Sequence, residues 1–294
     1  MAENMSNIAW TGLDTMPSMD DELYLKWRYL LEQRTGMILP DERRSFLVTS
    51  LAIRMREIGQ PCFQAYYDAI HDGHVGAIEW MVLVDRLTVH ETRFFRHMSS
   101  VEMIREMLLP DLMSVDEPPK SLNIWSVGCS TGEEPYTLAM VFDHFKQTDH
   151  CDYYFGITAS DISAASLATG RKGVYHSRKL RDVDRELRDK YFQRVDDTRY
   201  EIVSELRKRV CFAQLNVLEM EKIPVGKMHI IFCQNMLIYF DKDRRIEILN
   251  NLVDHLLPGG ILILGAGEIL GWYPPTLEKV DYNDTLAFRR LPCA

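Results

Sequence analysis

The sequence predicts an α/β fold: a doubly wound, mostly parallel sheet that follows an all-helical domain. From Leu122 onward, short apolar runs of strand length alternate with helical segments, the order typical of such a sheet. Between Asp21 and about Val89, apolar residues recur only at helical spacing. A tight turn with Gly128 and Gly132 joins the first apolar run to a helix, as in open α/β sheets that hold a nucleotide-like ligand.

The amino-terminal part is expected to form an arm and a helical domain. Residues 1–20 show no apolar pattern and indicate a flexible arm. Over residues 21–91, apolar side chains such as Leu23, Trp27 and Leu30 recur at helical spacing, and glycines separate the helices. This segment is therefore expected to be a small all-helical domain.

The sheet domain is expected over residues 92–294. A helical connector covers about 92–109, and a helix over 242–257 is expected to end at the Pro-Gly-Gly that follows it. The candidate strands are Leu122–Val127, Tyr153–Ala159, Arg209–Ala213, Met228–Cys233, Ile261–Gly265 and Leu286–Arg290.

One region breaks the alternation of strands and helices. Arg199–Ser204 and Arg209–Phe212 are short, strand-like and close together. We expect them to be antiparallel strands added to the edge of the sheet, within a small antiparallel β subdomain over about residues 175–213.

Composition limits the classes of function. A net charge of −9 argues against a general nucleic-acid binder. The six cysteines include no Cys-x-x-Cys pair and indicate reduced thiols. Neither a secretory signal nor a run of 18 apolar residues is present, so we expect a cytoplasmic protein without direct membrane insertion.

Two acids at the start of the helix narrow the choice of ligand. Glu133 and Glu134 follow Gly132 directly and would repel a phosphate, and the Gly-Lys-Ser/Thr of a P-loop is missing. The turn therefore suits a ligand with hydroxyls and a positive charge, such as S-adenosylmethionine. The alternative is that both acids only complement the dipole of a helix that starts near Pro135.

Polar residues follow other strands at the carboxyl ends, where open parallel sheets bind ligands. Asp161 is placed to accept hydrogen bonds from ribose hydroxyls, or else to cap the next helix. Asn216 can read an adenine edge, although an isolated loop asparagine is more often a turn residue. Gln234 and Asn235 emerge abruptly from a buried strand, with Tyr239 one helical turn later.

The segment Thr92–Arg96 is a candidate lid. Phe94 and Phe95 stand next to Thr92 and Arg96, and they are placed to close over a cofactor. In the alternative, which adjacent aromatics more often indicate, both phenylalanines are core residues that join the two domains. Arg96 is then a surface charge.

Together these segments resemble the CheR family of chemotaxis receptor methyltransferases. The family motifs Thr-x-Phe-Phe-Arg, Ser-Thr-Gly-Glu-Glu-Pro-Tyr, Ala-Ser-Asp-Ile and Cys-Arg-Asn-x-x-Ile-Tyr-Phe-Asp match at Thr92–Arg96, Ser130–Tyr136, Ala159–Ile162 and Cys233–Asp241. The likeness covers roughly residues 20–290, and four ordered motifs make it specific.

The resemblance implies a Rossmann-like sheet that uses S-adenosyl-L-methionine and yields S-adenosyl-L-homocysteine. It implies O-methylation of glutamate side chains on the cytoplasmic methylation helices of a membrane chemoreceptor, without a metal. By position it implies cofactor contacts from His90, Thr92, Arg96, Glu134, Asp161, Asn216, Val217, Gln234 and Asn235. Arg96 would orient the acceptor carboxylate, and Tyr239 would shape the methionyl end of the cofactor site.

Two single positions and one short segment depart from the family pattern. His90 stands where better-studied members have asparagine, and Gln234 replaces arginine, so a bidentate charged group is lost. Gly265–Glu268 reads Gly-Ala-Gly-Glu instead of the more common Gly-His-Ser-Glu. These differences indicate a divergent branch, such as that of the type IV pilus chemosensory systems.

Two segments bear on receptor binding. On the helix near 42–57, Arg43 and Arg54 are eleven residues apart and return to nearly the same face. The resemblance to the family implies contact of this face with an acidic receptor helix. The alternative is a solvated helix face. The connection Arg194–Arg199 lacks the Gly-x-Gly turn of members that hold a receptor's carboxy-terminal pentapeptide, so we expect no dependence on such a tether.

Two other functions stay open on sequence grounds. The chain could be a cofactor-binding regulator with weakened activity, because Gln234 and His90 depart from the pattern. It could also methylate a small molecule or a protein nitrogen.

Overall fold

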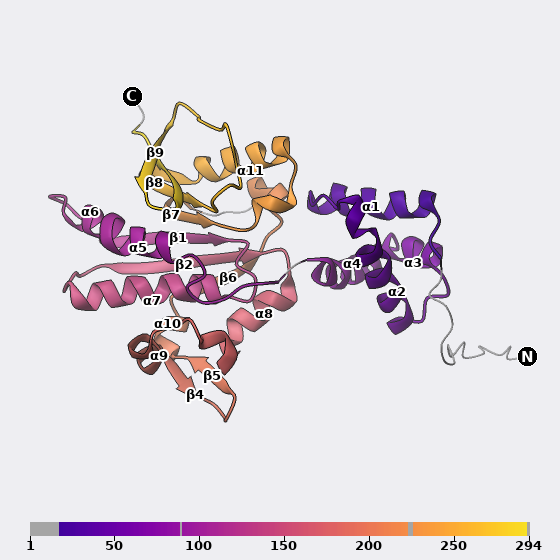
Figure 1. The fold of residues 1–294 in the computed structure, drawn as a ribbon, viewed down its shortest axis with the longest axis horizontal. Coiled ribbons are helices and arrows are strands. Elements are labelled where there is room, and N and C mark those ends of the chain that lie inside the picture. Colours follow the sequence, from indigo (N-terminus) through magenta and orange to yellow (C-terminus); the bar gives the residue numbers. More distant parts are fainter. Residues whose placement is uncertain (1–17, 89, 223–225, 293–294) are drawn as a thin grey trace, which may run out of the picture. The chain divides into compact units, whose positions relative to one another are not determined.

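The computed structural model describes residues 18–88, 90–222 and 226–292. It contains two compact units, one up to residue 89 and one from His90 onward (Figure 1). Most of the expected arm, residues 1–20, lies outside the described residues, as does Cys293. The other five cysteines are unpaired. Among the described helices, none is both long and apolar enough to cross a membrane.

The first unit is built from helices, as the sequence predicts. They are α1 (Asp21–Thr35), η1 (Asp41–Arg43), α2 (Arg44–Glu57), α3 (Phe63–Ile70) and α4 (Gly73–Leu87). Asp20 caps α1 by accepting a hydrogen bond from the Leu23 N–H at 2.7 Å, and Gly36, at φ +72°, ends it. Trp27 and Tyr66 pack at a centroid distance of 5.2 Å in the core of this unit.

Arg54, one of the two arginines expected to face the receptor, is engaged within the first unit. Its guanidinium donates to both carboxylate oxygens of Glu79, at 2.8 and 2.6 Å, and the Tyr66 hydroxyl also donates to Glu79. Arg44 is likewise paired with Asp21 at 2.7 Å. The internal pairing of Arg54 therefore leaves it less available to a partner than the sequence indicates.

The second unit is organised around a seven-stranded sheet with the order β6-β2-β1-β7-β8-β10-β9. Its strands are β1 (Ser121–Val127), β2 (Tyr154–Asp161), β6 (Val210–Gln214), β7 (Met228–Cys233), β8 (Leu256–Leu264), β9 (Leu277–Tyr282) and β10 (Thr285–Arg290). The first five strands in this order are parallel to one another, β10 runs antiparallel to β8, and β9 runs antiparallel to β10.

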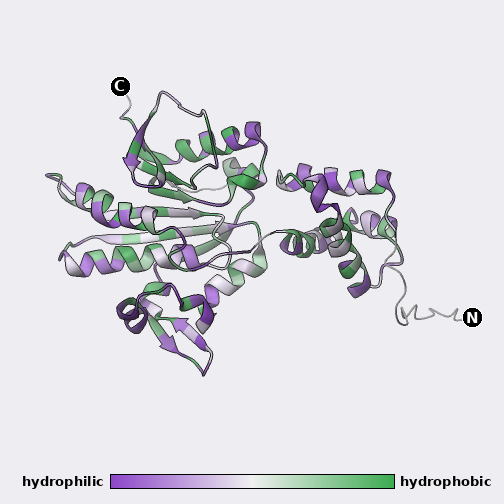
Figure 2. Cartoon of the chain, viewed as in Figure 1, coloured by the Kyte–Doolittle hydropathy of each residue, from purple (hydrophilic) through white to green (hydrophobic). Residues whose placement is uncertain are grey.

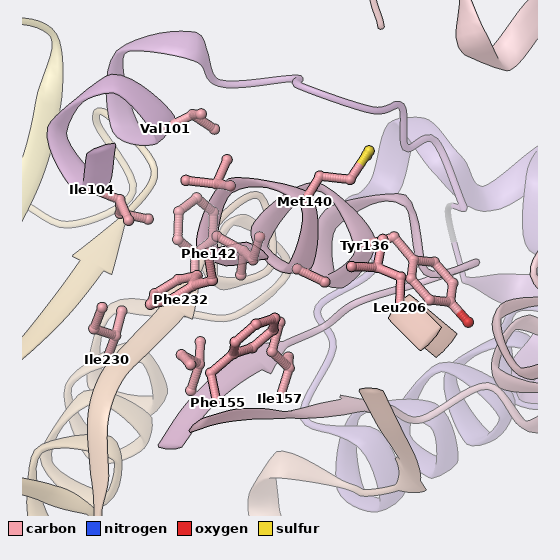
Figure 3. Packing of buried hydrophobic residues seen from close by; sticks show 14 of the residues in the cluster. Val101, Ile104, Tyr136, Met140, Phe142, Phe155, Ile157, Leu206, Ile230 and Phe232 are labelled. Atoms are coloured by element: carbon pink, nitrogen blue, oxygen red, sulfur yellow. The ribbon is translucent and has the colours of Figure 1, made fainter. Parts of the chain in front are cut away.

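Helices cover both faces of this sheet. α7 (Glu133–Thr148) packs on one face and α11 (Lys242–Asp254) on the other, and both carry mixed hydrophobic and hydrophilic residues (Figure 2). Ile124 of β1 belongs to the core with α7, and the next residue, Trp125, to the core with α11, as expected for a strand buried on both sides. Phe142 of α7 packs on Phe155 of β2 at a centroid distance of 5.7 Å (Figure 3). The predicted doubly wound sheet is confirmed.

Shorter elements complete the second unit. They are α5 (Met98–Met103), the π-helical turn η2 (Ile104–Leu108), α6 (Leu109–Met113), α8 (Ala164–Lys172), η4 (Val217–Lys222) and η5 (Leu237–Tyr239). The connector expected to be helical from residue 92 becomes helical only at Met98.

A separate three-stranded antiparallel sheet, β3-β5-β4, forms the small subdomain. Its elements are β3 (Val174–His176), η3 (Ser177–Leu180), α9 (Arg185–Tyr191), β4 (Phe192–Arg194), β5 (Arg199–Ile202) and α10 (Ser204–Arg207). The main sheet and this small sheet have no strand in common.

Three strand and helix assignments from the sequence are corrected. Arg199–Ser204 is not on the edge of the main sheet, because β5 pairs with β3 and β4. The strand expected over Arg209–Phe212 is parallel to β2, not antiparallel. The helix expected over 242–257 ends at Asp254, because Leu256 already begins β8.

Candidate active site

The glycine loop, residues 128–132, connects β1 to α7 and is held against the end of β2. The N–H of Gly128 donates to the Ser160 carbonyl at 2.8 Å. Gly128 has φ +75°, and a Cβ added there would lie 3.1 Å from the Cβ of Met236, in the turn that follows β7. Backbone angle and close packing therefore both require glycine at this position.

The carboxylate of Asp161 fixes the glycine loop by accepting a hydrogen bond from it. One carboxylate oxygen accepts the N–H of Ser130 at 2.7 Å, and the other accepts the N–H of Ser163 at 2.9 Å. The cap of α8 is Ser163, whose hydroxyl accepts the Ser166 N–H, so Asp161 is not the helix cap. Burial raises the pKa of Asp161, and the nearby His90 opposes that rise.

The two glutamates at the start of α7 have different environments. Glu133 is fully buried, pairs with Lys179 and accepts a hydrogen bond from the Thr131 hydroxyl at 2.6 Å. Glu134 accepts a hydrogen bond from the Ser126 hydroxyl at 2.7 Å. Burial raises the pKa of Glu134 to about 8, while the positive charge of Arg96 acts to lower it. Glu133 thus supports the fold, and Glu134 is the acid on whose pKa the charge of Arg96 acts.

The turn after β7 carries the predicted polar residues. The amide nitrogen of Gln234 donates to the Ser100 hydroxyl at 2.9 Å and to the Leu264 carbonyl at 3.0 Å. Gln234 is buried, and its carbonyl oxygen has no hydrogen-bond partner among the described residues. Asn235, at φ +60°, approaches His97 with its side-chain oxygen 2.6 Å from Nε2. The side-chain nitrogen of Gln234 therefore links α5 to β8, and only the side-chain carbonyl oxygen of Gln234 remains to bind a ligand.

Glu268 organises the same turn and received no role from the sequence. It is buried, and its carboxylate accepts the N–H groups of Leu237 at 3.1 Å and Gly265 at 2.8 Å. These bonds fix η5, which ends at Tyr239, against the end of β8. The only sequence signal was an acid just after an apolar strand, in the segment already noted as divergent.

In the segment Thr92–Arg96 both phenylalanines are buried, as in the alternative to a lid. Phe94 is buried and packs edge-on against Tyr175 and Phe192, at centroid distances of 5.0 and 5.3 Å. Phe95 is also buried. Both phenylalanines are core residues of the second unit. Arg96 is half-buried and donates to the Glu91 carbonyl at 2.6 Å.

Asn216 and Val217 begin the turn after β6. The side-chain oxygen of Asn216 accepts the Leu218 N–H at 3.1 Å, so the asparagine caps η4. Val217 is buried in the core on the α11 side of the sheet. The N–H of Leu215 donates to the Asp161 carbonyl at 2.9 Å, which brings this turn beside the end of β2.

Residues 90–284 match the family described as CheR methyltransferase, SAM binding domain, and residues 22–88 match CheR methyltransferase, all-alpha domain. The chain belongs to the CheR methyltransferase family. Over 252 residues it is 31% identical to chemotaxis protein methyltransferase 2 of Vibrio cholerae, covering 84% of this chain and 85% of that one. Over 273 residues it is 31% identical to chemotaxis protein methyltransferase 1 of Pseudomonas aeruginosa, covering 92% and 97%. The resemblance found in the sequence is confirmed.

The site of this CheR-family enzyme fits S-adenosylmethionine, its cofactor. The Ser130 hydroxyl and the Gln234 carbonyl oxygen are buried without a hydrogen-bond partner among the described residues. The carboxylates of Glu134 and Asp161 can bind a cation and hydroxyl groups. Gly128 has no side chain, so a ligand can come close to its backbone. This donor set suits a positively charged nucleoside better than a phosphate.

Proposed function

We propose that this enzyme methylates glutamate side chains on the cytoplasmic methylation helices of a chemoreceptor, for sensory adaptation in a pathway such as pilus-driven twitching. The observation that carries this proposal is the match of residues 22–88 and 90–284 to the two CheR family models. Within the site, the charge of Arg96 acts to lower the pKa of Glu134. A permanent cation beside the cofactor loop suits an anionic acceptor.

The chemistry requires placement more than proton transfer. A glutamate carboxylate, with an ordinary pKa of about 4.3, is already ionised at neutral pH and needs no general base. When bound, the cofactor supplies a methyl group activated by a positively charged sulfur. An oxygen–carbon bond to the acceptor forms as the sulfur–carbon bond breaks, giving a methyl ester and S-adenosylhomocysteine. Because opposite charges are neutralised, positioning and partial desolvation should supply most of the rate.

Different residues would position the acceptor carboxylate and the cofactor. Arg96 would orient the acceptor carboxylate, and Tyr239 would shape the methionyl end of the cofactor site. Cofactor contacts are proposed from the residues that the resemblance implies, namely His90, Thr92, Arg96, Glu134, Asp161, Asn216, Val217, Gln234 and Asn235. For Gln234 the proposed contact is its carbonyl oxygen, because the amide nitrogen is already bonded within the protein.

We propose that receptor binding does not depend on a pentapeptide tether. The turn between β4 and β5 is closed by Asp196, which accepts the N–H groups of Thr198 at 2.9 Å and Arg199 at 2.8 Å. These bonds lower the pKa of Asp196 to about 2. A short turn locked in this way, without glycine, favours independence from the tether. Tight binding of such a peptide in calorimetry would contradict this.

Labelled methyl transfer tests the proposed function. The enzyme is incubated with labelled S-adenosylmethionine and receptor cytoplasmic domains, and the product is treated with mild alkali. Release of methanol identifies a carboxyl methyl ester, whereas an N-methyl product is stable. Arg96→Ala should abolish most transfer, and full activity in that variant removes the role proposed for Arg96. Cofactor binding without any transfer favours instead a regulator with weakened activity.

A further inference from the structure

The loop between β8 and β9, residues 265–276, buries some of its large apolar side chains and exposes others. Ile269 and Trp272 are buried, and the Trp272 ring packs edge-on against Phe288 at 5.3 Å. Leu270 and Tyr273 are 79% and 77% exposed. A loop anchored in the core in this way can hold its outward apolar side chains ready for a partner.

The exposed side chains border a pocket. Leu270 and Tyr273 line a cavity of about 320 Å³, together with Trp272, Leu286 and Phe288 from the loop and β10. Lys279 and Asp284 are its charged lining residues. An apolar side chain of a partner would therefore meet Leu270, Trp272, Leu286 and Phe288 in this pocket.

The loop is joined to the turn that carries Tyr239. Glu268 accepts the Leu237 N–H, and Arg245 donates to the carbonyl oxygens of Phe240 and Glu268, both at 2.8 Å. These bonds make η5 and the start of the loop one structural piece. A partner seated on the loop would therefore be held in a fixed relation to Tyr239.

Another exposed apolar side chain lies on the same piece, in η5. Ile238, the neighbour of Tyr239, is 51% exposed. Leu270 and Tyr273 follow on the connected loop. A membrane or a second copy of the chain could also cover exposed apolar residues. The hydrogen bonds that join the loop to the turn of Tyr239 favour the methyl acceptor as the occupant.

We propose that the β8–β9 loop docks the apolar stripe of the acceptor helix, with one apolar side chain in the pocket between Leu270 and Tyr273. This inference rests on the proposed function. The loop then sets which glutamate of an amphipathic helix reaches Arg96, because residues three or four positions apart share one helix face.

The test compares wild type with the double variant Leu270→Ser/Tyr273→Ser and with Val115→Ser as control. Val115 is 52% exposed and precedes β1, at the opposite end of that strand from the glycine loop. Methyl transfer is measured against the concentration of a soluble receptor cytoplasmic fragment. The double variant should raise KM for the fragment about tenfold or more, as expected when contact residues are truncated. The kcat at saturation and the affinity for S-adenosylhomocysteine should stay unchanged, and Val115→Ser should alter none of these.

Each other result overturns the inference in an identifiable way. If the KM of the double variant matches that of Val115→Ser, the loop does not dock the acceptor. If wild type alone sediments with lipid vesicles while KM is unaffected, a membrane is the occupant. If wild type is a dimer that the double variant dissociates, again without a change in KM, the occupant is a second copy. If wild type binds cofactor yet methylates no fragment, the proposed function itself fails, and the docking role falls with it.

Discussion

Lys179 forms an ion pair with Glu133 that joins the small sheet's subdomain to the start of α7. The Lys179 ammonium lies 2.8 Å from a carboxylate oxygen of Glu133, whose side chain has no exposed surface. The same ammonium donates to the Thr92 carbonyl at 2.7 Å. One cation therefore holds both the helix start that carries Glu134 and the segment that carries Arg96.

Lys179→Met should destabilise the enzyme and weaken its cofactor site. Removing the cation leaves a buried carboxylate unpaired, which should lower the free energy of unfolding by about 2 kcal/mol, since Lys179 is itself partly exposed. Urea unfolding measures this, with the exposed Lys172→Met as control. Adding Glu133→Gln to Lys179→Met should recover part of the loss. Equal stability of the two lysine variants would show that the pair has no such role.

Glu134 should make cofactor affinity depend on pH. With its pKa raised to about 8, the group is mostly neutral at pH 7 in the free enzyme. A cationic ligand favours the ionised form, so binding should release a proton, and affinity should rise with pH up to about 8 and then level off. Calorimetry in buffers of different ionisation enthalpy counts that proton. Glu134→Gln should show a flat profile, and a flat profile in wild type would contradict the expectation.

Glu134 should also make folding stability depend on pH. Stability should fall as the pH rises, whereas cofactor affinity should increase. The pKa of Glu134 is raised from 4.5 to about 8 on folding, so its contribution is fully present below about 4.5 and is lost as pH rises through about 8. Wild type should therefore lose stability relative to Glu134→Gln between about pH 5 and pH 8. Urea midpoints of both proteins at the two pH values test this. A difference that does not change with pH would refute the assignment.

The core strands could be predicted from the sequence because their apolar runs are continuous. Met228–Cys233 was predicted with the boundaries that the structure shows, since β7 is buried on both faces. Leu277–Tyr282 was missed, because it is a half-exposed edge strand with charged residues. The pairing of Arg199–Ile202 with β3 and β4 depends on partners that no local pattern names.

The site was predictable where a motif is local and hidden where it depends on distant contacts. Gly128 and Glu134 belong to one short segment, so their place beside the sheet followed from the order strand, turn, helix. Glu268 supports a turn about thirty residues earlier in the chain, and Lys179 pairs with an acid more than forty residues away. Such partners are fixed by the fold and leave no spacing signal in the sequence.

Asp161→Asn should loosen the glycine loop and reduce cofactor affinity. The carboxylate accepts N–H groups from Ser130 and Ser163, and asparagine would present an amide nitrogen to one of these two donors. Loss of a charged hydrogen bond of this kind is worth about 1.5–3 kcal/mol, or roughly tenfold to a hundredfold in affinity. Calorimetry with S-adenosylhomocysteine gives the value, with the exposed Asp189→Asn as control. Unchanged affinity would mean that Asp161 does not shape the site.

Gly128→Ala and Gly259→Ala form a matched pair that separates backbone strain from crowding at the site. Both glycines have positive φ, +75° and +78°, so alanine should cost about 1 kcal/mol of folding stability at each. A Cβ at Gly259 meets nothing within 4 Å, whereas one at Gly128 lies 3.1 Å from Met236. Only Gly128→Ala should therefore displace the turn that carries Tyr239 and weaken binding of S-adenosylhomocysteine, by about tenfold. If both variants bind equally well, the contact between the glycine loop and Met236 has no part in cofactor binding.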